Sequence, residues 1–217
     1  MFSKIIRSGK TELYRFLNTK NEKAVIVPQE IDQLSNRTFS NKDAKGVELV
    51  YLHDGITEIP DHCFEGSTVR AVRLSPKTKR IGDAAFKNCA NLSYIHVPEG
   101  CGLGTRTWNG SWAGSATVFE NCPKMRQKWT PWIQSVKEAD GRFIILWEGG
   151  LLQHSTDKGK TWTHVLDDES GYCVAIPKKD PVLYRVAVKN DNPTPRQPGE
   201  WRPVTGMIQV KENHAKS

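Results

Sequence analysis

The chain has 217 residues, of which 37% are hydrophobic and 25% charged, and a formal net charge of +7 at pH 7. This length allows one sizeable hydrophobic core or two smaller ones. The longest apolar run, Phe143 to Trp147, is far shorter than the roughly 20 residues of a membrane-spanning helix, so we expect no membrane insertion. The five cysteines are an odd number and the six histidines lack metal-ligand spacing. We therefore expect neither a disulfide scaffold nor a metal or cofactor.

The first 44 residues are predicted to form an extended or partly helical arm. The first 23 of them carry six basic and two acidic side chains, the densest basic segment of the chain. Such a segment suits an acidic partner or nucleic acid, and because no nucleic-acid-binding motif accompanies it, we expect an anchor and no nucleic acid. The segment also lacks the long apolar stretch of a signal peptide, so export by that route is not expected.

A repeated pattern begins near residue 45. Residues 59–67 align with residues 81–89 at an offset of 22, with Ile, Asp and Phe in register, and residues 119–125 repeat the end of the pattern. A unit of this size cannot bury its apolar face alone, so stacked units are predicted, with Phe and Ile in a continuous ladder under a small parallel sheet. The predicted strands place apolar residues at their first, fourth and sixth positions: Val47, Val50, Leu52; Val69, Val72, Leu74; Leu92, Ile95, Val97.

Residues 45–126 resemble the BspA-like leucine-rich repeat. The resemblance implies a short solenoid of about three units, in which Cys89 and Cys122 are small buried residues. A catalytic thiol at either position is the alternative. The preceding copy departs from the family pattern, with Cys63 in place of its alanine and Ser67 in place of its cysteine. The closest copy carries the family residues Ile81, Ala85, Phe86, Cys89, Leu92, Ile95 and Pro98.

Residues 102–115 interrupt the repeats and hold two tryptophans, Trp108 and Trp112, among glycines and small polar residues. Insertions in a solenoid project from one face and often carry its contacts, which makes both tryptophans candidate ligand-binding residues. The alternative is that they cover the exposed end of the solenoid. Under either interpretation, Asn109-Gly110 predicts a hairpin turn.

Residues 140–217 are predicted to form a small all-β module, because strand-like runs alternate with turn residues. Residues 155–162 resemble the Asp-box motif. The resemblance implies a structural hairpin in which the aspartate accepts hydrogen bonds from turn amides, the glycine takes a positive φ and the tryptophan packs over the turn. A single box in so short a segment excludes a sialidase propeller. The motif residues are Ser155, Asp157, Gly159, Thr161 and Trp162.

The end of the chain resembles the small chitin-binding modules attached to chitinases. Residues 183–186, Asn192-Pro193 and residues 198–201 follow the order of that family's strand, turn and terminal tryptophan motif. The resemblance implies a sugar-stacking platform formed by Tyr184 and Trp201. The alternative is that both aromatic side chains fill the core of the module.

No nucleophile elbow, phosphate loop, paired catalytic carboxylates or Cys/His arrangement occurs at a motif spacing, so a non-enzymatic protein is expected. The expected fold is mixed and β-rich, with a short leucine-rich-repeat solenoid followed by an all-β module. The repeats imply recognition or adhesion.

Together with the expected lack of export, the repeats lead to the hypothesis of a bacteriophage virion protein. It would be a head fibre, capsid decoration or tail protein, in the form of a homotrimer. It would bind virion proteins, a host surface protein or a glycan. The alternative is a cytoplasmic or cell-surface bacterial leucine-rich-repeat scaffold that binds a protein partner.

Overall fold

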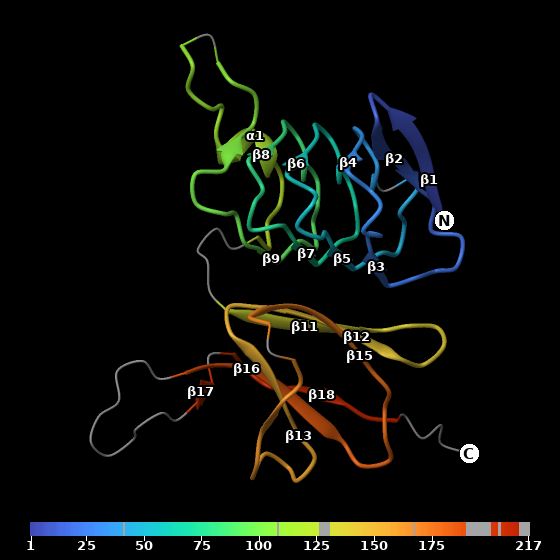
Figure 1. The fold of residues 1–217 in the computed structure, drawn as a ribbon, viewed down its shortest axis with the longest axis vertical. Coiled ribbons are helices and arrows are strands. Elements are labelled where there is room, and N and C mark those ends of the chain that lie inside the picture. Colours follow the sequence, from blue (N-terminus) through green and yellow to red (C-terminus); the bar gives the residue numbers. More distant parts are fainter. Residues whose placement is uncertain are drawn as a thin grey trace. The chain divides into compact units, whose positions relative to one another are not determined.

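The chain folds into two compact units, Met1–Trp129 and Thr130–Ser217, which we call the solenoid unit and the C-terminal unit (Figure 1). Strands β1 to β10 and helix α1 belong to the first, and strands β11 to β18 to the second. No helix in the described ranges is long and apolar enough to cross a membrane. The structure is a computed structural model. It describes residues 1–40, 42–107, 109–125, 131–166, 168–189, 201–203 and 205–212.

One side of the solenoid unit is a four-stranded parallel sheet, with one strand from each of four successive coils. The strands pair in chain order and hold Val25, Val50, Val72 and Ile95 in register. β-Branched residues suit these positions because their side chains pack well on a pleated, half-buried surface. The sheet confirms the predicted parallel strands and has one more strand before them. Its members are β3 (Ala24–Ile26), β5 (Leu49–Tyr51), β7 (Ala71–Arg73) and β9 (Tyr94–Ile95).

A second row of short strands runs along another side of the same coils. Leu13 pairs with Leu34, and Ile59, Ile81 and Leu103 are in register with one another. The first strand of this row also forms an antiparallel hairpin with β1. The elements are β1 (Phe2–Arg7), β2 (Lys10–Phe16), β4 (Gln33–Leu34), β6 (Glu58–Ile59), β8 (Arg80–Ile81) and β10 (Gly102–Leu103).

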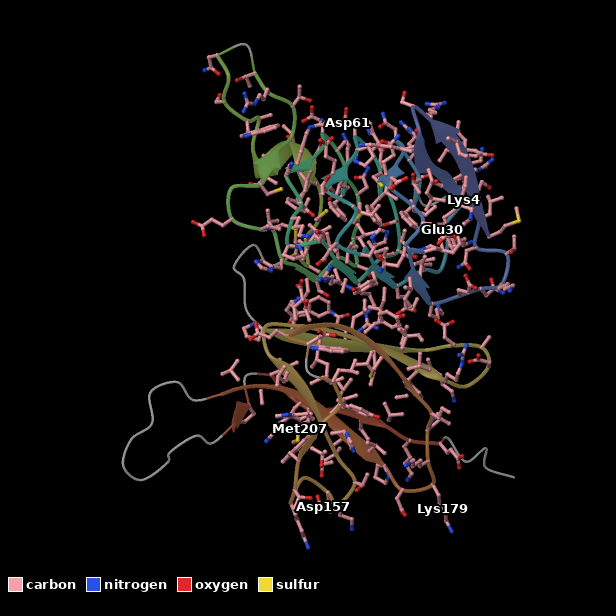
Figure 2. The ribbon with its side chains drawn as sticks, viewed as in Figure 1. Lys4, Glu30, Asp61, Asp157, Lys179 and Met207 are labelled. Atoms are coloured by element: carbon pink, nitrogen blue, oxygen red, sulfur yellow. The ribbon has the colours of Figure 1, made fainter. Side chains whose placement is uncertain are left out.

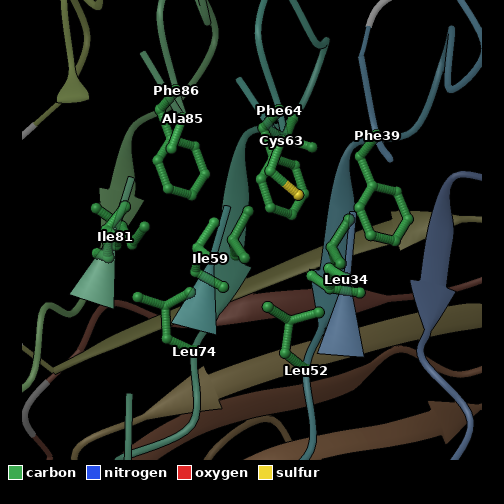
Figure 3. Close-up of a cluster of buried hydrophobic side chains, with 14 of the residues drawn as sticks. Leu34, Phe39, Leu52, Ile59, Cys63, Phe64, Leu74, Ile81, Ala85 and Phe86 are labelled. Atoms are coloured by element: carbon green, nitrogen blue, oxygen red, sulfur yellow. The ribbon is translucent and has the colours of Figure 1, made fainter. Parts of the chain in front are cut away.

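A ladder of six phenylalanine rings fills the interior of the solenoid unit. Neighbouring ring centroids lie 4.9 to 5.6 Å apart, which is close to the spacing of adjacent strands. Figure 3 shows Phe39, Phe64 and Phe86 in this row, with aliphatic side chains of the same coils beside them. The predicted ladder of Phe and Ile is therefore confirmed. Its rings belong to Phe2, Phe16, Phe39, Phe64, Phe86 and Phe119.

Residues 1–44 do not form the predicted arm but fold as the first coils of the solenoid. Leu13, Phe16, Leu34 and Phe39 are buried in the same core as the later repeats. An ion pair between Lys4 and Glu30, with 3.1 Å between nitrogen and oxygen, links the hairpin to the next coil (Figure 2). The arm was predicted from the basic, mixed-polarity composition of this segment. The apolar residues of the segment do belong to the repeat, but their spacing is irregular. Leu13, Leu34 and Ile59 occupy equivalent positions, yet their offsets are 21 and 25 residues instead of 22.

The far end of the solenoid unit contains the insert and a four-residue helix, α1 (Ser115–Val118). Val118 and Phe119 are buried and extend the core beyond the coil of Phe86. The backbone N–H groups of Ala84 and Phe86 donate to the carbonyls of Thr117 and Val118, respectively. The third copy predicted from residues 119–125 is thus joined to the solenoid, although the insert separates it in sequence.

The C-terminal unit is built from antiparallel strands, as predicted, and its first strand begins at Trp132, ahead of the predicted boundary at residue 140. Its core contains Ile145, Trp147, Leu152 and Val186, which come from both of its sheets. One sheet has the order β11 (Trp132–Lys137), β12 (Phe143–Glu148), β15 (Ser170–Ala175). The other has the order β14 (Thr163–His164), β13 (Leu151–Ser155), β16 (Val182–Lys189), β17 (Trp201–Pro203), and β18 (Ile208–Val210) also pairs with β16.

Candidate binding face of the solenoid unit

The second row of strands presents a polar face to solvent, which we call the binding face. Each strand alternates between a side chain in the core and one on the outside, because successive residues of a strand point to opposite sides. The buried residues Leu13, Leu34, Ile59 and Ile81 are each preceded by a polar residue. The outward positions of the binding face are Glu12, Gln33, Glu58, Arg80 and Gly102.

Two hairpins border this face at opposite ends of the solenoid unit. At the N-terminal end, β1 and β2 meet at Ser8-Gly9, where both residues have positive φ (49° and 75°), the geometry of a tight hairpin turn. At the other end, residues 102–115 fold back through a bridge between Arg106 and Trp112. Figure 1 shows this insert projecting at the end of the unit opposite to the β1–β2 hairpin.

A polar pocket of about 590 Å³ lies on the binding face. The β1–β2 hairpin forms one wall, and β4, β6 and β8 contribute the rest of the lining. The lining contains three basic and three acidic side chains, and among the described residues no aromatic side chain takes part. The charged residues are Arg7, Lys10, Arg80, Glu12, Asp32 and Glu58.

The side chain of Glu12 is held firmly at the base of the pocket. The Ser35 hydroxyl donates to its carboxylate, Gln33 Nε2 donates over 3.0 Å, and an Arg7 nitrogen lies 3.9 Å away. The hydrogen bond from Ser35 is the main cause that keeps the pKa of Glu12 below its ordinary value, although burial opposes it. Asp32 is also engaged, because it accepts the Thr11 N–H over 2.7 Å.

The other side of the pocket is braced against the insert. Arg80 donates to the Asp61 carboxylate over 2.6 Å and to the Gly104 carbonyl over 3.2 Å. Asp83 accepts hydrogen bonds from the backbone N–H and the hydroxyl of Thr105 at the base of the insert. The hydrogen bond from the Thr105 hydroxyl is the main cause that keeps the pKa of Asp83 below its ordinary value, and the bond from the Thr105 N–H acts in the same direction. Asp61 is labelled on this side of the unit in Figure 2.

Two charged side chains of the pocket make no hydrogen bond or ion pair with the other described residues. Lys10 and Glu58 are both exposed. Neither the Lys10 ammonium nor the Glu58 carboxylate has an ion-pair or hydrogen-bond partner within the described part of the chain. The Lys10 ammonium and the Glu58 carboxylate are therefore exposed to solvent without a partner among the described residues.

Trp112 both covers the end of the solenoid and remains partly exposed. Its ring lies over Gly102 so closely that an added Cβ there would be 2.2 Å from it. The Arg106 guanidinium lies 5.2 Å from the ring centroid, and 37% of Trp112 is accessible. The structure is thus compatible with both interpretations of Trp112, as a ligand-binding residue and as a cover for the end of the solenoid. Trp108 lies outside the described residues. The hairpin turn predicted at Asn109-Gly110 is present, with Gly110 at a φ of 83°.

Residues 155–162 form a closed network of hydrogen bonds in the C-terminal unit. Asp157 accepts the Thr161 N–H over 2.9 Å, the Thr161 hydroxyl over 2.6 Å and the Ser155 hydroxyl over 2.7 Å. Gly159 has a φ of 85° and accepts the Trp162 indole N–H at its carbonyl, over 3.0 Å. These contacts are the ones expected for a structural turn, while membership of the Asp-box class stays a prediction.

Tyr184 and Trp201 do not lie directly opposite one another. Tyr184 packs against the core of the C-terminal unit and pairs with Ile208 of β18. The backbone of Trp201 pairs with Lys189, five residues further along β16, or about 16 Å away at the rise of a strand. The side chain of Trp201, like residues 190–200, lies outside the described residues, so the sugar platform stays a prediction.

Cys63 and Cys89 are buried in the solenoid core, and Cys122 is half-buried beside it. The Cys89 thiol donates to the Phe64 carbonyl over 3.0 Å, and the Cys122 thiol donates to the Phe86 carbonyl over 2.8 Å. Burial raises the pKa of the Cys63 thiol far above its ordinary value. Cys89 is thus a small buried side chain, as the resemblance implies, whereas Cys122 is only half-buried against the core.

The pocket residues were not singled out from the sequence. The available signal was the alternation of polar and apolar residues in Glu12-Leu13, Gln33-Leu34, Glu58-Ile59 and Arg80-Ile81. This alternation has no fixed period, since the first two pairs precede the regular repeat. Only the three-dimensional stacking brings the four polar residues onto one face.

The stacked coils and their shared ladder define a solenoid repeat protein. Residues 10–127, more than half of the chain, match the BspA type leucine rich repeat region in six copies, and the chain belongs to this family. The solenoid therefore contains six repeat units instead of the predicted three, and it begins near residue 10 instead of residue 45. This family and fold are typically non-enzymatic and generally mediate protein interactions.

One solved structure resembles the chain, a leucine-rich repeat protein from Bacteroides ovatus, with 18% sequence identity and a TM-score of 0.43. The likeness covers 56% of this chain and 32% of that protein, so the chain spans about a third of its length. No curated protein is similar enough to count as a relative.

Proposed function

We propose that this chain is a non-enzymatic recognition scaffold that holds a protein partner against the binding face. The observation that carries the proposal is the pocket itself, a polar recess on a stacked ladder, next to a projecting hairpin. The ladder of six phenylalanine rings makes the support rigid, because each inner ring is packed on both neighbours. A rigid support keeps the entropy lost on binding small.

The chemistry of the pocket favours binding over catalysis. A general acid that works near neutral pH needs a raised carboxyl pKa, whereas hydrogen bonds lower that of Glu12. Arg80 and Asp32 are held by neighbouring groups instead of being directed at a reacting atom. Such paired charges position a partner and select against others.

Photo-cross-linking tests the proposal directly. A photoreactive amino acid replaces Asn36, an exposed residue of the pocket, in one variant, and Lys179, an exposed residue of the C-terminal unit, in a matched control (Figure 2). We expect one defined protein adduct from the Asn36 position that the Lys179 position does not give. Identical adduct patterns from both positions would contradict the proposal.

We also propose that the scaffold is a bacteriophage virion component, such as a head fibre, capsid decoration or tail protein. Support comes from the recognition role of the repeats and from a second β-rich unit able to serve for attachment. The proposal includes no free basic arm as an anchor, because residues 1–44 fold into the solenoid.

Detection of the protein in purified particles, and a trimeric mass in solution, are the expected results. Recovery from host cytoplasm or cell surface alone would favour the alternative bacterial scaffold. Glycan binding through Tyr184 and Trp201 belongs to the same proposal. A glycan-array signal that Trp201→Ala abolishes is the expected result there.

A further inference from the structure

We infer that the pocket takes an extended peptide segment of mixed charge, with an acidic side chain next to Lys10 and a basic side chain next to Glu58. This inference rests on the proposed function and names the chemistry of the partner. It concerns the side of the coils that carries β4, β6 and β8, not the four-stranded sheet.

Paired and unpaired charges are distributed unevenly over the pocket. Glu12 and Arg80 have oppositely charged neighbours in Arg7 and Asp61, and Asp32 accepts a hydrogen bond from the Thr11 N–H. Lys10 and Glu58 have no such partners within the described residues. Arg7 stands beside Lys10, is 66% exposed in its side chain and reaches Glu12 only at 3.9 Å. An anion is therefore favoured at the hairpin wall and a cation at β6.

The lining of the pocket is unsuited to nucleic acid, sugar and lipid ligands. Three acidic side chains in the lining oppose a polyanion such as nucleic acid, which needs a predominantly basic surface. No aromatic side chain among the described lining residues offers a stacking surface for a sugar ring. Only Leu34 and Pro60 are apolar, so a lipid would find little surface to bury. A peptide, with polar backbone groups and charged side chains, matches what remains.

The distance between Lys10 and Glu58 matches the side-chain spacing of an extended peptide. Lys10 lies two residues before Glu12 on β2, about 7 Å along the strand. Glu58 lies two coils from Glu12, about 10 Å across at the usual strand spacing. The two free charges are therefore about 12 Å apart at their Cα atoms. Side chains four residues apart in an extended peptide share one side and are separated by about 13 Å. An acid and a base at this spacing fit the pocket.

The test uses three synthetic peptides with a common serine and threonine background. One carries an aspartate and an arginine four residues apart, one carries two aspartates and one carries two arginines at the same positions. Binding to the full chain is measured by titration of backbone amide chemical shifts at low salt. We expect the mixed peptide to bind about tenfold more tightly than either of the others, with shifts at Lys10 and Glu58.

Charge reversal supplies the second half of the test. Lys10→Glu is expected to transfer the preference to the doubly basic peptide, and Glu58→Lys to the doubly acidic peptide. Both residues are exposed, so neither change disturbs the core. Lys179→Glu, in the C-terminal unit, is the matched control and should leave the preference unchanged.

Equal affinity for the three peptides, or a preference that neither reversal moves, would overturn the inference. The proposed function would survive that result if the Asn36 adduct still formed. Loss of the Asn36 adduct would instead remove the proposed function.

Discussion

Six phenylalanines each contribute one ring to the ladder inside the solenoid unit. Phe64 lies between Phe39 and Phe86, with centroid distances of 5.0 and 4.9 Å and rings nearly parallel. All three rings are completely buried. Offset stacking of this kind adds to the hydrophobic contribution of each ring.

Phe64→Ala is expected to lower the free energy of unfolding by about 3–5 kcal/mol, because it removes a buried ring from the middle of the ladder. Chemical denaturation followed by circular dichroism measures the change. Ile6→Ala is the control, since Ile6 is 77% exposed and should change stability by about 0.5 kcal/mol or less. If Phe64→Ala lowered the free energy of unfolding as little as Ile6→Ala, the result would contradict a stabilising role of the ladder.

Asp157 is expected to make the stability of the C-terminal unit depend on pH. Hydrogen bonds from Thr161, and then from Ser155, hold the pKa of its carboxyl well below the ordinary value. Its contribution is therefore present above the unfolded-state pKa of about 4 and is lost as pH falls through the lower folded-state pKa.

Asp157→Ala should consequently lower the melting temperature at pH 7, and the difference from wild type should narrow as the pH falls below about 4. Thermal unfolding at a series of pH values measures it. Asp180→Ala, at an exposed position in the same unit, should show no comparable change. A difference that stays constant down to pH 2 would show that Asp157 acts in another way.

At the scale of elements, the insert is attached to the solenoid by a specific fit between Gly102 and Trp112. Gly102 stands at an outward position of the binding face, where every other member has a side chain. The Trp112 ring takes the space that a side chain would fill. The absence of a Cβ thus decides where the hairpin lies.

Gly102→Ala is expected to displace the Trp112 ring, because the new methyl group would lie 2.2 Å from it. The fold should persist, since Gly102 lies on β10, the last strand of its row. The Trp112 indole N–H signal in NMR spectra, and its protection from solvent, are the measurements. Gly206→Ala is a suitable control, because an added Cβ there meets nothing within 4 Å. An unchanged Trp112 signal would contradict the packing.

At the scale of the whole molecule, each unit has a hydrophobic core of its own. The solenoid unit depends on contacts between successive coils, so its stability is a sum of coil and interface contributions. The C-terminal unit depends on antiparallel pairing between strands distant in sequence.

Residues 1–129 and 130–217, produced separately, are therefore expected to fold on their own. Each fragment should unfold cooperatively, and its amide spectrum should overlay on that of the full chain away from the cut. Deletion of residues 1–44, a cut inside the solenoid unit, is the contrasting variant. We expect this deletion to destabilise the remaining coils, because it exposes part of a continuous core. Failure of both fragments to fold would show that the two cores are not independent.

The amino-acid sequence by itself determined the regular part of the ladder. The offset of 22 between Ile59 and Ile81, and between Phe64 and Phe86, is visible because each coil repeats one pattern of burial. The turn at residues 155–162 could also be predicted from the sequence, because its hydrogen bonds join residues that are close together in the chain.

Only the tertiary structure decided the rest. Irregular offsets of 21 and 25 residues conceal the first coils from any search for a fixed period, yet Leu13 and Leu34 occupy the same core as Ile59. The pocket combines Lys10 with Glu58, which are distant in sequence and have no pattern in common. A site of this kind arises where stacked coils place unrelated polar residues side by side, and stacking is a property of the folded chain.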